Sequence, residues 1–268
     1  MTSESGSGAI GGSAGSTADA GSVARALAVA VLLAALGIVA GIALVAAAGI
    51  GLRLTGVDIT PLLSIVLSLV LATGLGFGGV ALLYLRYRDF GLSYVGVRVP
   101  SVREFLYAAV GYVAALTLGL SATIVVSQTG VEAGTNNAAQ VGMENPEILL
   151  LLIPASLLLI GPGEELLYRG VVQNRLRERL PATVAIPLAS LIFAAIHYFS
   201  LSGAPSARLV SISLLVLPTL VFGVVYELSD NIVVPALTHG AYNATLFSLL
   251  YVALQFSGMQ PPSGLLFF

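Results

Sequence analysis

From Val23 onward the chain is a succession of long apolar runs separated by short polar segments. Each run holds about 20 residues, which is enough for an α-helix to cross a hydrocarbon core of about 30 Å. We therefore predict seven membrane helices, at roughly 25–51, 59–85, 104–127, 147–170, 182–200, 207–227 and 231–255. The predicted fold class is all-α, a polytopic transmembrane bundle of about seven helices (7–8), and we expect its chemistry in the C-terminal four.

The composition excludes several other classes of protein. Apolar residues make up 57% of the 268 residues and charged residues only 9%, against about 25% charged residues in an ordinary soluble domain. The net charge is -2, so no strongly basic surface is available and we expect no nucleic-acid partner. Cysteine is absent, which excludes disulfides, thiolate zinc sites and cysteine nucleophiles.

Polar composition and the distribution of ionisable residues divide the chain. Residues 1–22 are rich in Gly and Ser and lack the features of a signal peptide, so we predict a disordered cytoplasmic tail. A three-helix membrane part follows at 23–146. A catalytic four-helix membrane core at 147–257 contains most of the ionisable residues at membrane depth, and 258–268 is a C-terminal tail.

Arginine placement predicts the orientation. If the N-terminus starts on one side, all Arg residues except Arg53 and Arg208 fall on that side. By the positive-inside rule, the N-terminus and the loops 86–103 and 171–181 are cytoplasmic. The long loop 128–146 contains no Arg, in agreement with an external position. We therefore expect a multi-pass protein of the cell membrane with its N-terminus in the cytoplasm.

Four ionisable residues lie inside the apolar segments: Glu164, Glu165, His197 and His239. A charge at the centre of a membrane helix costs about 2.5–3.5 kcal/mol, so such residues mark functional sites by default. The two histidines are the only ones in the protein.

The segment 161–169 can be interpreted by helical geometry. Glu165 and Arg169 are four residues apart and share a face, which favours an ion pair. Glu164 lies about 100° around the helix and is left for another role. Gly161–Gly163, with its central proline, should kink or restart the helix and present free N–H groups to the carboxylates. An ion pair that merely joins two helices would explain Glu165 and Arg169 but not Glu164.

The histidine segments also place polar groups on common faces. His239 and Asn243 are four residues apart, so an imidazole and an amide point the same way. A single membrane histidine is as often an interhelical hydrogen-bonding residue as a functional one. Two histidines together with two glutamates favour a site.

Depth in the membrane can be counted along the helices. Glu165 lies about 16 residues before a cytoplasmic turn and His197 about 16 after it, so a helical hairpin brings both to one level. His239 lies only about 9 residues above the turn near Asp230 and is expected nearer the cytosol. We favour an arrangement in which 171–180 lies along the interface and lowers the first two residues toward His239.

Three motifs in order resemble one family. Glu164, Glu165 and Arg169 form Glu-Glu-x-x-x-Arg, 193–197 forms Phe-x-x-x-His, and 239–243 forms His-x-x-x-Asn. This pattern is similar to that of the CPBP intramembrane proteases, also called the ABI family, which include the type II CAAX prenyl endopeptidases. The resemblance covers about 150–245. It implies a CPBP-type intramembrane (metallo)endopeptidase with a helical membrane core and a catalytic cavity that opens toward the cytosol.

The resemblance also implies roles for six residues. These are activation of the attacking water by Glu164 with His197, stabilisation of the oxyanion by His239 with Asn243, and support of that site by Glu165 with Arg169. A zinc ion held by Glu164, His197 and His239 is the alternative, because two His and one Glu form the ligand set of many hydrolytic zinc sites. The sequence leaves this open, since it has no local His-Glu-x-x-His helix.

Substrate and alternatives complete the expectations. The partners would be the lipid bilayer and a membrane-associated protein or peptide, prenylated if the processing is of the CAAX type. Aromatic residues beside the site are candidates for cavity walls or for helix packing, namely Tyr168, Phe193, Tyr198, Phe199 and Tyr242. The alternative functions are a proton-coupled transporter, disfavoured by the lack of visible repeats, and a catalytically silent membrane scaffold or immunity protein.

Overall fold

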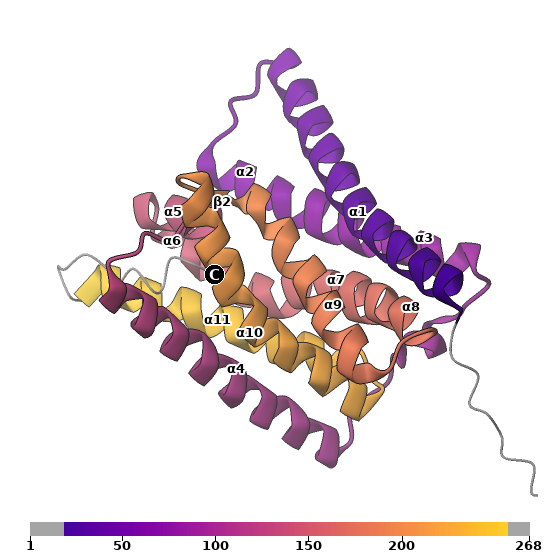
Figure 1. Ribbon diagram of the computed structural model, residues 1–268. Coiled ribbons are helices and arrows are strands. Elements are labelled where there is room, and N and C mark those ends of the chain that lie inside the picture. Colours follow the sequence, from indigo (N-terminus) through magenta and orange to yellow (C-terminus); the bar gives the residue numbers. More distant parts are fainter. Residues whose placement is uncertain (1–18, 257–268) are drawn as a thin grey trace, which may run out of the picture.

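A computed structural model describes residues 19–256 of the chain (Figure 1). The predicted tail 258–268 and most of the predicted tail 1–22 lie outside these residues. The described part is essentially all-α, which confirms the predicted fold class.

The N-terminal half contains three long helical runs. Their elements in chain order are α1 (Ala20–Leu54), α2 (Pro61–Leu67), the π-helix η1 (Ser68–Gly78), α3 (Gly79–Tyr87), the 3-10 turn η2 (Leu92–Val95), α4 (Val102–Thr129), the two-residue strand β1 (Thr135–Asn136) and α5 (Asn137–Glu144). The second run is one continuous helix, Pro61–Tyr87.

The C-terminal half contains four more helical runs. Its elements are α6 (Glu147–Ala155), the π-helix η3 (Ser156–Ile160), α7 (Gly161–Glu165), the π-helix η4 (Leu166–Gln173), α8 (Asn174–Arg177), α9 (Ala182–Ile196), the 3-10 turn η5 (His197–Ser200), β2 (Leu201–Ser202), α10 (Pro205–Ser229) and α11 (Val233–Phe256). All seven predicted helical segments therefore form in the described chain.

Six of the seven runs are long and apolar enough to cross a membrane, counted over residues 19–256. The seventh, α11, is helical over 24 residues but is not among these six. Its polar site residues His239 and Asn243 lower its hydropathy. The chain is a multi-pass membrane protein, as predicted.

Small residues let α1 pack closely on η1. A Cβ at Gly76 would lie 2.8 Å from Cα of Gly41, so the two backbones touch. Bulky residues such as Leu32 and Val39 occupy the outward face of α1 and are exposed. This division is typical of membrane helices, whose contacts use small residues while large apolar residues face lipid.

The helix does not restart at Pro162. It runs without a break over Glu147–Arg177, and Gly161 itself has helical φ and ψ. A π-helix, Ser156–Ile160, directly precedes the Gly-Pro-Gly segment. The wider π-turn accommodates a proline that lacks an N–H and whose ring would clash with a preceding carbonyl. The predicted restart was therefore wrong, whereas the alternative that we predicted, a kink, stays a prediction.

Helix α10 lies parallel to the end of this long helix. Arg169 Nη2 donates to the carbonyl of Thr219 at 3.0 Å, and four residues on Gln173 Nε2 donates to that of Gly223 at 3.1 Å. This register continues into α8, so Asn174–Arg177 extends the helix. The favoured position of 171–180 along the interface is not what the structure has.

A close crossing with α11 brings His239 to the glutamates instead. A Cβ on Gly161 would lie 2.5 Å from the carbonyl oxygen of Ala236, and one on Gly240 would lie 2.7 Å from that of Ser156. Glycines at both positions let the two backbones meet. The crossing lies directly beside Glu164 and His239 in the sequence, and it fixes their relative position.

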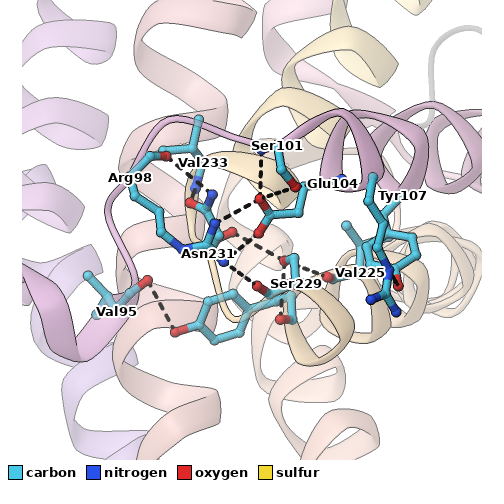
Figure 2. Close-up of polar contacts among 11 residues, drawn as sticks. Val95, Arg98, Ser101, Glu104, Tyr107, Val225, Ser229, Asn231 and Val233 are labelled. Atoms are coloured by element: carbon cyan, nitrogen blue, oxygen red, sulfur yellow. Dashed lines mark hydrogen bonds and ion pairs between the residues drawn. The ribbon is translucent and has the colours of Figure 1, made fainter.

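The start of α11 is held by a polar network at one end of the bundle (Figure 2). Asn231 Oδ1 accepts from the backbone N–H of Val233, and its Nδ2 donates to the carbonyl of Arg98 at 3.2 Å. Arg98 also donates to the carbonyl of Ser229 and forms an ion pair with the buried Glu104. The connector that precedes α4 thereby holds the α10–α11 turn.

The opposite end of the bundle carries α5 and β2, away from α8 (Figure 1). β1 pairs with β2 in an antiparallel bridge, Thr135 with Ser202 and Asn136 with Leu201. Because β2 follows η5 directly, this bridge ties the segment around α5 to the segment that contains His197.

Candidate active site

A cavity of about 380 Å³ lies among α2, η1, α5, α7, α9 and α11. Four of the six motif residues line it: Glu164, His197, His239 and Asn243. The volume falls in the usual range for ligand-binding cavities. The remaining polar lining groups are Ser64, Ser68, Thr73, Asn136, Asn137, Ser200 and Tyr242.

The other two motif residues lie behind the cavity wall. Glu165 and Arg169 are completely buried, and Oε2 of Glu165 lies 3.3 Å from Nε of Arg169. The ion pair predicted from the four-residue spacing is thus confirmed. Glu164 is left facing the cavity, as the 100° offset between adjacent helical residues requires.

Glu165 makes a second contact that the spacing did not predict. Nδ1 of His239 donates to Oε1 of Glu165 at 2.8 Å. Each carboxylate oxygen of Glu165 therefore has one partner, the imidazole or the guanidinium. Sequence spacing could not indicate this contact, because His239 lies 74 residues from Glu165. The only signal in the sequence was that two glutamates are adjacent.

Aromatic rings surround this buried chain of charges. The Arg169 guanidinium lies 4.8 Å from the ring centre of Phe193 and 5.8 Å from that of Phe222. The His239 ring stacks on Phe222 at 4.7 Å with an interplanar angle of 17°. Cation–π contacts of this kind compensate part of the desolvation of a buried cation, and the stacking fixes the plane of the imidazole.

The far nitrogen of His239 points toward the cavity. Its Nε2 lies 3.2 Å from Nδ2 of Asn243 and 4.0 Å from Oε2 of Glu164. Because Nδ1 is the donor to Glu165, Nε2 is the acceptor of a neutral ring and becomes a donor only when the ring takes up a proton. Glu165 therefore sets both the orientation and the tautomer of His239.

His197 is oriented in a similar way by backbone. It ends α9, and its Nδ1 lies 2.9 Å from the carbonyl of Phe193, four residues earlier. Since a carbonyl only accepts, Nδ1 carries the proton and Nε2 is left as an acceptor. The Phe-x-x-x-His motif thus has a local reason, because it orients the histidine from within its own helix.

A metal ion would need several ligands around one point. Among residues 19–256, no group of three His, Asp or Glu side chains is placed to hold a metal. The predicted zinc ligands Glu164, His197 and His239 line one cavity without forming such a group. Zinc use stays a prediction, and no step below passes through a metal.

The first helices contribute to the cavity, although we placed the chemistry in the C-terminal four. α2 and η1 supply Ser64, Ser68 and Thr73. A Cβ on Gly163 would lie 2.8 Å from the carbonyl oxygen of Thr73, so η1 packs directly against α7. All six motif residues lie within 147–257, but the cavity needs walls from outside this segment. The domain boundaries themselves stay a prediction.

A second cavity of about 490 Å³ reaches Glu164 and His197 from another side. It lies between α1, η1 and the end of α9, and it shares Glu164 and His197 with the first cavity. Its other walls are mainly small or apolar side chains of α1 and η1, namely Gly37, Ile38, Gly41, Ile42, Val45, Ala46, Ala72 and Phe77. Two cavities, the first with more polar lining side chains than the second, thus converge on Glu164.

The candidate aromatic walls separate into two groups. Phe193 and Tyr242 line the first cavity and Phe199 the second. Tyr168 is fully buried with its ring edge against Phe193, and Tyr198 packs under Arg208. Three of these side chains therefore form walls, while the other two pack helices.

The orientation predicted from the arginines and the cytosolic cavity opening implied by the resemblance disagree for this chain. The lining residues Ser64, Asn137 and Ser200 lie in α2, in α5 and directly before β2. These elements lie at one end of the bundle (Figure 1). The arginine-rich loops lie at the other end. If the arginines are cytoplasmic, the first cavity approaches the outer side of the membrane. The resemblance instead implied a cavity that opens toward the cytosol.

Comparison with known proteins identifies the segment that holds these residues. Residues 146–245 match the family model described as type II CAAX prenyl endopeptidase Rce1-like. Neither the curated proteins nor the solved structures contain a match to the chain. The matched segment contains all six motif residues, so the family match supports the resemblance that those motifs indicated for this part of the chain.

Proposed function

We propose that the protein is an intramembrane endopeptidase that hydrolyses a peptide bond with water activated by Glu164 and His197. One observation carries the proposal: Glu164 faces a cavity that also contains both histidines, while its neighbour Glu165 is committed to Arg169 and His239. Two adjacent glutamates therefore have two separate tasks.

Water activation needs a base that is not already neutralised. Glu164 is 8% exposed and lines both cavities, and among residues 19–256 its one ion-pair contact is with His239 Nε2, at 4.0 Å. A water between Glu164 and the acceptor nitrogen of His197 would lose its proton to the carboxylate as its oxygen bonds to the carbonyl carbon. The surrounding apolar walls keep bulk water from competing for these groups.

The negative charge that develops on the carbonyl oxygen needs donors. Nδ2 of Asn243 supplies one, and Nε2 of His239 supplies a second when its ring is protonated. The Glu165 carboxylate at 2.8 Å stabilises the positive charge on that ring. When the tetrahedral intermediate collapses, the C–N bond breaks and the leaving amine takes the proton from Glu164.

We further propose that substrates are membrane-associated peptides or proteins, with CAAX-type processing of a prenylated C-terminus as the first candidate. The family description supports this substrate class. The first cavity has more polar lining side chains and suits a peptide segment, and the more apolar second cavity suits an apolar chain or side chain beside it.

The test is cleavage of a mixed panel of prenylated C-terminal peptides and transmembrane peptides by purified protein in detergent, analysed by mass spectrometry. Glu164→Gln should abolish product, while Glu147→Gln, in the first turn of α6, should leave it unchanged. Both variants must elute as folded, monodisperse samples. A folded native protein that cleaves nothing, or a Glu164→Gln variant that still cleaves, would contradict the proposal.

A further inference from the structure

The first cavity has one wall that lies outside the family segment. Asn136, Asn137, Ala138 and Val141 line the cavity together with Glu164 and His197. They belong to β1 and α5, whereas the family match begins at residue 146. We call residues 135–144 the cap. Its contribution to the site belongs to this chain and not to the family motifs.

The cap is fixed by contacts with the segment that follows His197. Besides the β1–β2 pairing, Ser202 Oγ donates to Oδ1 of Asn137, and Ser211 Oγ donates to the carbonyl of Gly134 at 2.8 Å. A Cβ on Gly134 would lie 2.9 Å from the carbonyl oxygen of Ser202, so this approach is close. The cap is therefore a positioned wall, attached to the part of the chain that holds His197.

In two asparagine side chains of the cap, the amide oxygen accepts hydrogen bonds while the amide nitrogen has no partner in the described part of the protein. Oδ1 of Asn136 accepts from the N–H groups of Ala138 and Ala139 and thereby caps α5. Oδ1 of Asn137 accepts from Ser202. Within residues 19–256, the Nδ2 group of neither asparagine has a hydrogen-bond partner. Two side-chain N–H donors thus remain on the part of the cavity wall that the cap forms, where Asn136 is half-buried and Asn137 is exposed.

A peptide in this cavity needs such donors. Its carbonyl groups leave water when they enter, and an unpaired buried carbonyl is costly. About half of the side chains that line the cavity are apolar, and none of the polar ones is a donor only. Asparagine amides at fixed positions would pair with backbone carbonyls and tolerate different side chains.

Resting on the proposed function, we propose that Asn136 and Asn137 are specificity-determining residues that bind the backbone carbonyls of a substrate peptide beside the scissile bond. Their Nδ2 groups donate, and the cap thereby selects an extended backbone and sets its register against Glu164. The proposal assigns substrate binding to a part of the chain that the family motifs do not include.

Single substitutions can separate substrate binding from support of the cap. Asn137→Asp keeps the acceptor for Ser202 but removes the Nδ2 donor, and Asn136→Asp keeps the α5 cap, because Asp is an equally good N-cap residue. Ser202→Ala removes the support of Asn137 and keeps its donor. Asn145→Ala is the matched control, since Asn145 caps the end of α5 and does not line the cavity.

The measurement is kcat and KM on a peptide that the native protein cleaves, with the cut positions determined by mass spectrometry. We expect both Asp variants to raise KM about tenfold or more with a smaller change in kcat, and to shift or broaden the cut positions. Asn145→Ala should stay within about twofold of the native protein, and Ser202→Ala should raise KM less than Asn137→Asp does, because it keeps the Nδ2 donor.

Other outcomes would overturn the proposal. If Ser202→Ala and Asn137→Asp lose activity equally, through kcat and with unchanged cut positions, the cap is only structural. If both Asp variants cleave as the native protein does, the amides do not touch substrate. Cleavage by the native protein and its loss in Glu164→Gln test the proposed function separately, so either idea can fail without the other.

Discussion

Oε1 of Glu165 lies 2.8 Å from Nδ1 of His239, and its Oε2 lies 3.3 Å from Nε of Arg169. The Glu165 carboxylate therefore contacts both the Arg169 guanidinium, which is buried behind the cavity wall, and the His239 imidazole, which lies in that wall. The contact leaves the outer nitrogen of His239 beside Asn243 and within 4.0 Å of Glu164. The buried ion pair acts as the support on which the exposed half of the site is oriented.

Breaking this support should destabilise the protein. We predict that Arg169→Met lowers stability by about 3–5 kcal/mol, because it leaves the charge of Glu165 buried without its cation. Thermal unfolding in detergent, followed by circular dichroism, measures the effect. Adding Glu165→Gln to Arg169→Met should recover much of this loss, since neither charge then remains.

The same variants separate stability from activity. Glu165→Gln keeps a hydrogen-bond acceptor for His239 but removes the negative charge. The double variant Glu165→Gln, Arg169→Met should therefore regain stability but cleave at least about 10²-fold more slowly than the native protein. Full activity in the double variant would mean that Glu165 has no role beyond packing.

The helix crossing at Gly240 should be sensitive to a single methyl group. Its Cβ would lie 2.7 Å from the carbonyl oxygen of Ser156 and 2.9 Å from Cα of Leu157, and neither is a flexible side-chain end. We predict that Gly240→Ala costs about 1–3 kcal/mol and displaces the adjacent His239, which lowers kcat. Denaturation and kinetics on the same preparation give both values.

Gly79→Ala is the matched control. It also introduces a methyl group on a helical glycine of a membrane run, but nothing lies within 4 Å of its Cβ position. This substitution should leave activity unchanged and stabilise the helix by a few tenths of a kcal/mol to about 1 kcal/mol. Equal effects at the two glycines would contradict the argument from close approach.

Metal dependence can be measured directly. Nδ1 of His239 is used by Glu165 and Nε2 faces the amide of Asn243, so a metal would have to displace Asn243 from this ring. We predict that activity persists after treatment with a zinc chelator and that metal analysis of the active protein finds less than one zinc per chain. Loss on chelation with recovery on adding zinc would instead establish the zinc enzyme.

Orientation can be tested cleanly because the chain contains no cysteine. Glu132→Cys places one thiol at the end near the cap, and Arg179→Cys places one at the arginine-rich end. From the positive-inside rule, a membrane-impermeant maleimide should label the first in intact cells and the second only after permeabilisation. The reverse pattern would put the cavity on the cytosolic side.

Local rules were enough for the helices and for part of the site. Runs of about 20 apolar residues can satisfy their backbone in lipid only as helices, so all seven helical segments follow from length and composition. The pairing of Glu165 with Arg169 follows from a four-residue spacing on a helix. Both depend only on geometry within one element, which the sequence specifies directly.

Tertiary packing decided what the periodicity could not. The unbroken helix through Pro162 depends on a π-turn, and the contact between Glu165 and His239 depends on the crossing at Gly161 and Gly240. Depth counting assumes helices of equal tilt, so it could not anticipate this crossing. The cap likewise joins the site through a two-residue strand pairing across 65 positions.

The sequence by itself therefore determined the class of protein, the membrane helices and the identity of the six polar residues that lipid makes costly. Only the tertiary structure decided which of them face the cavity, which lie behind it and which outer segment closes it. The physical reason is that spacing along one helix sets directions around its axis. Contacts between helices depend on crossing angles and close backbone approaches, which are settled only when all of the helices pack together.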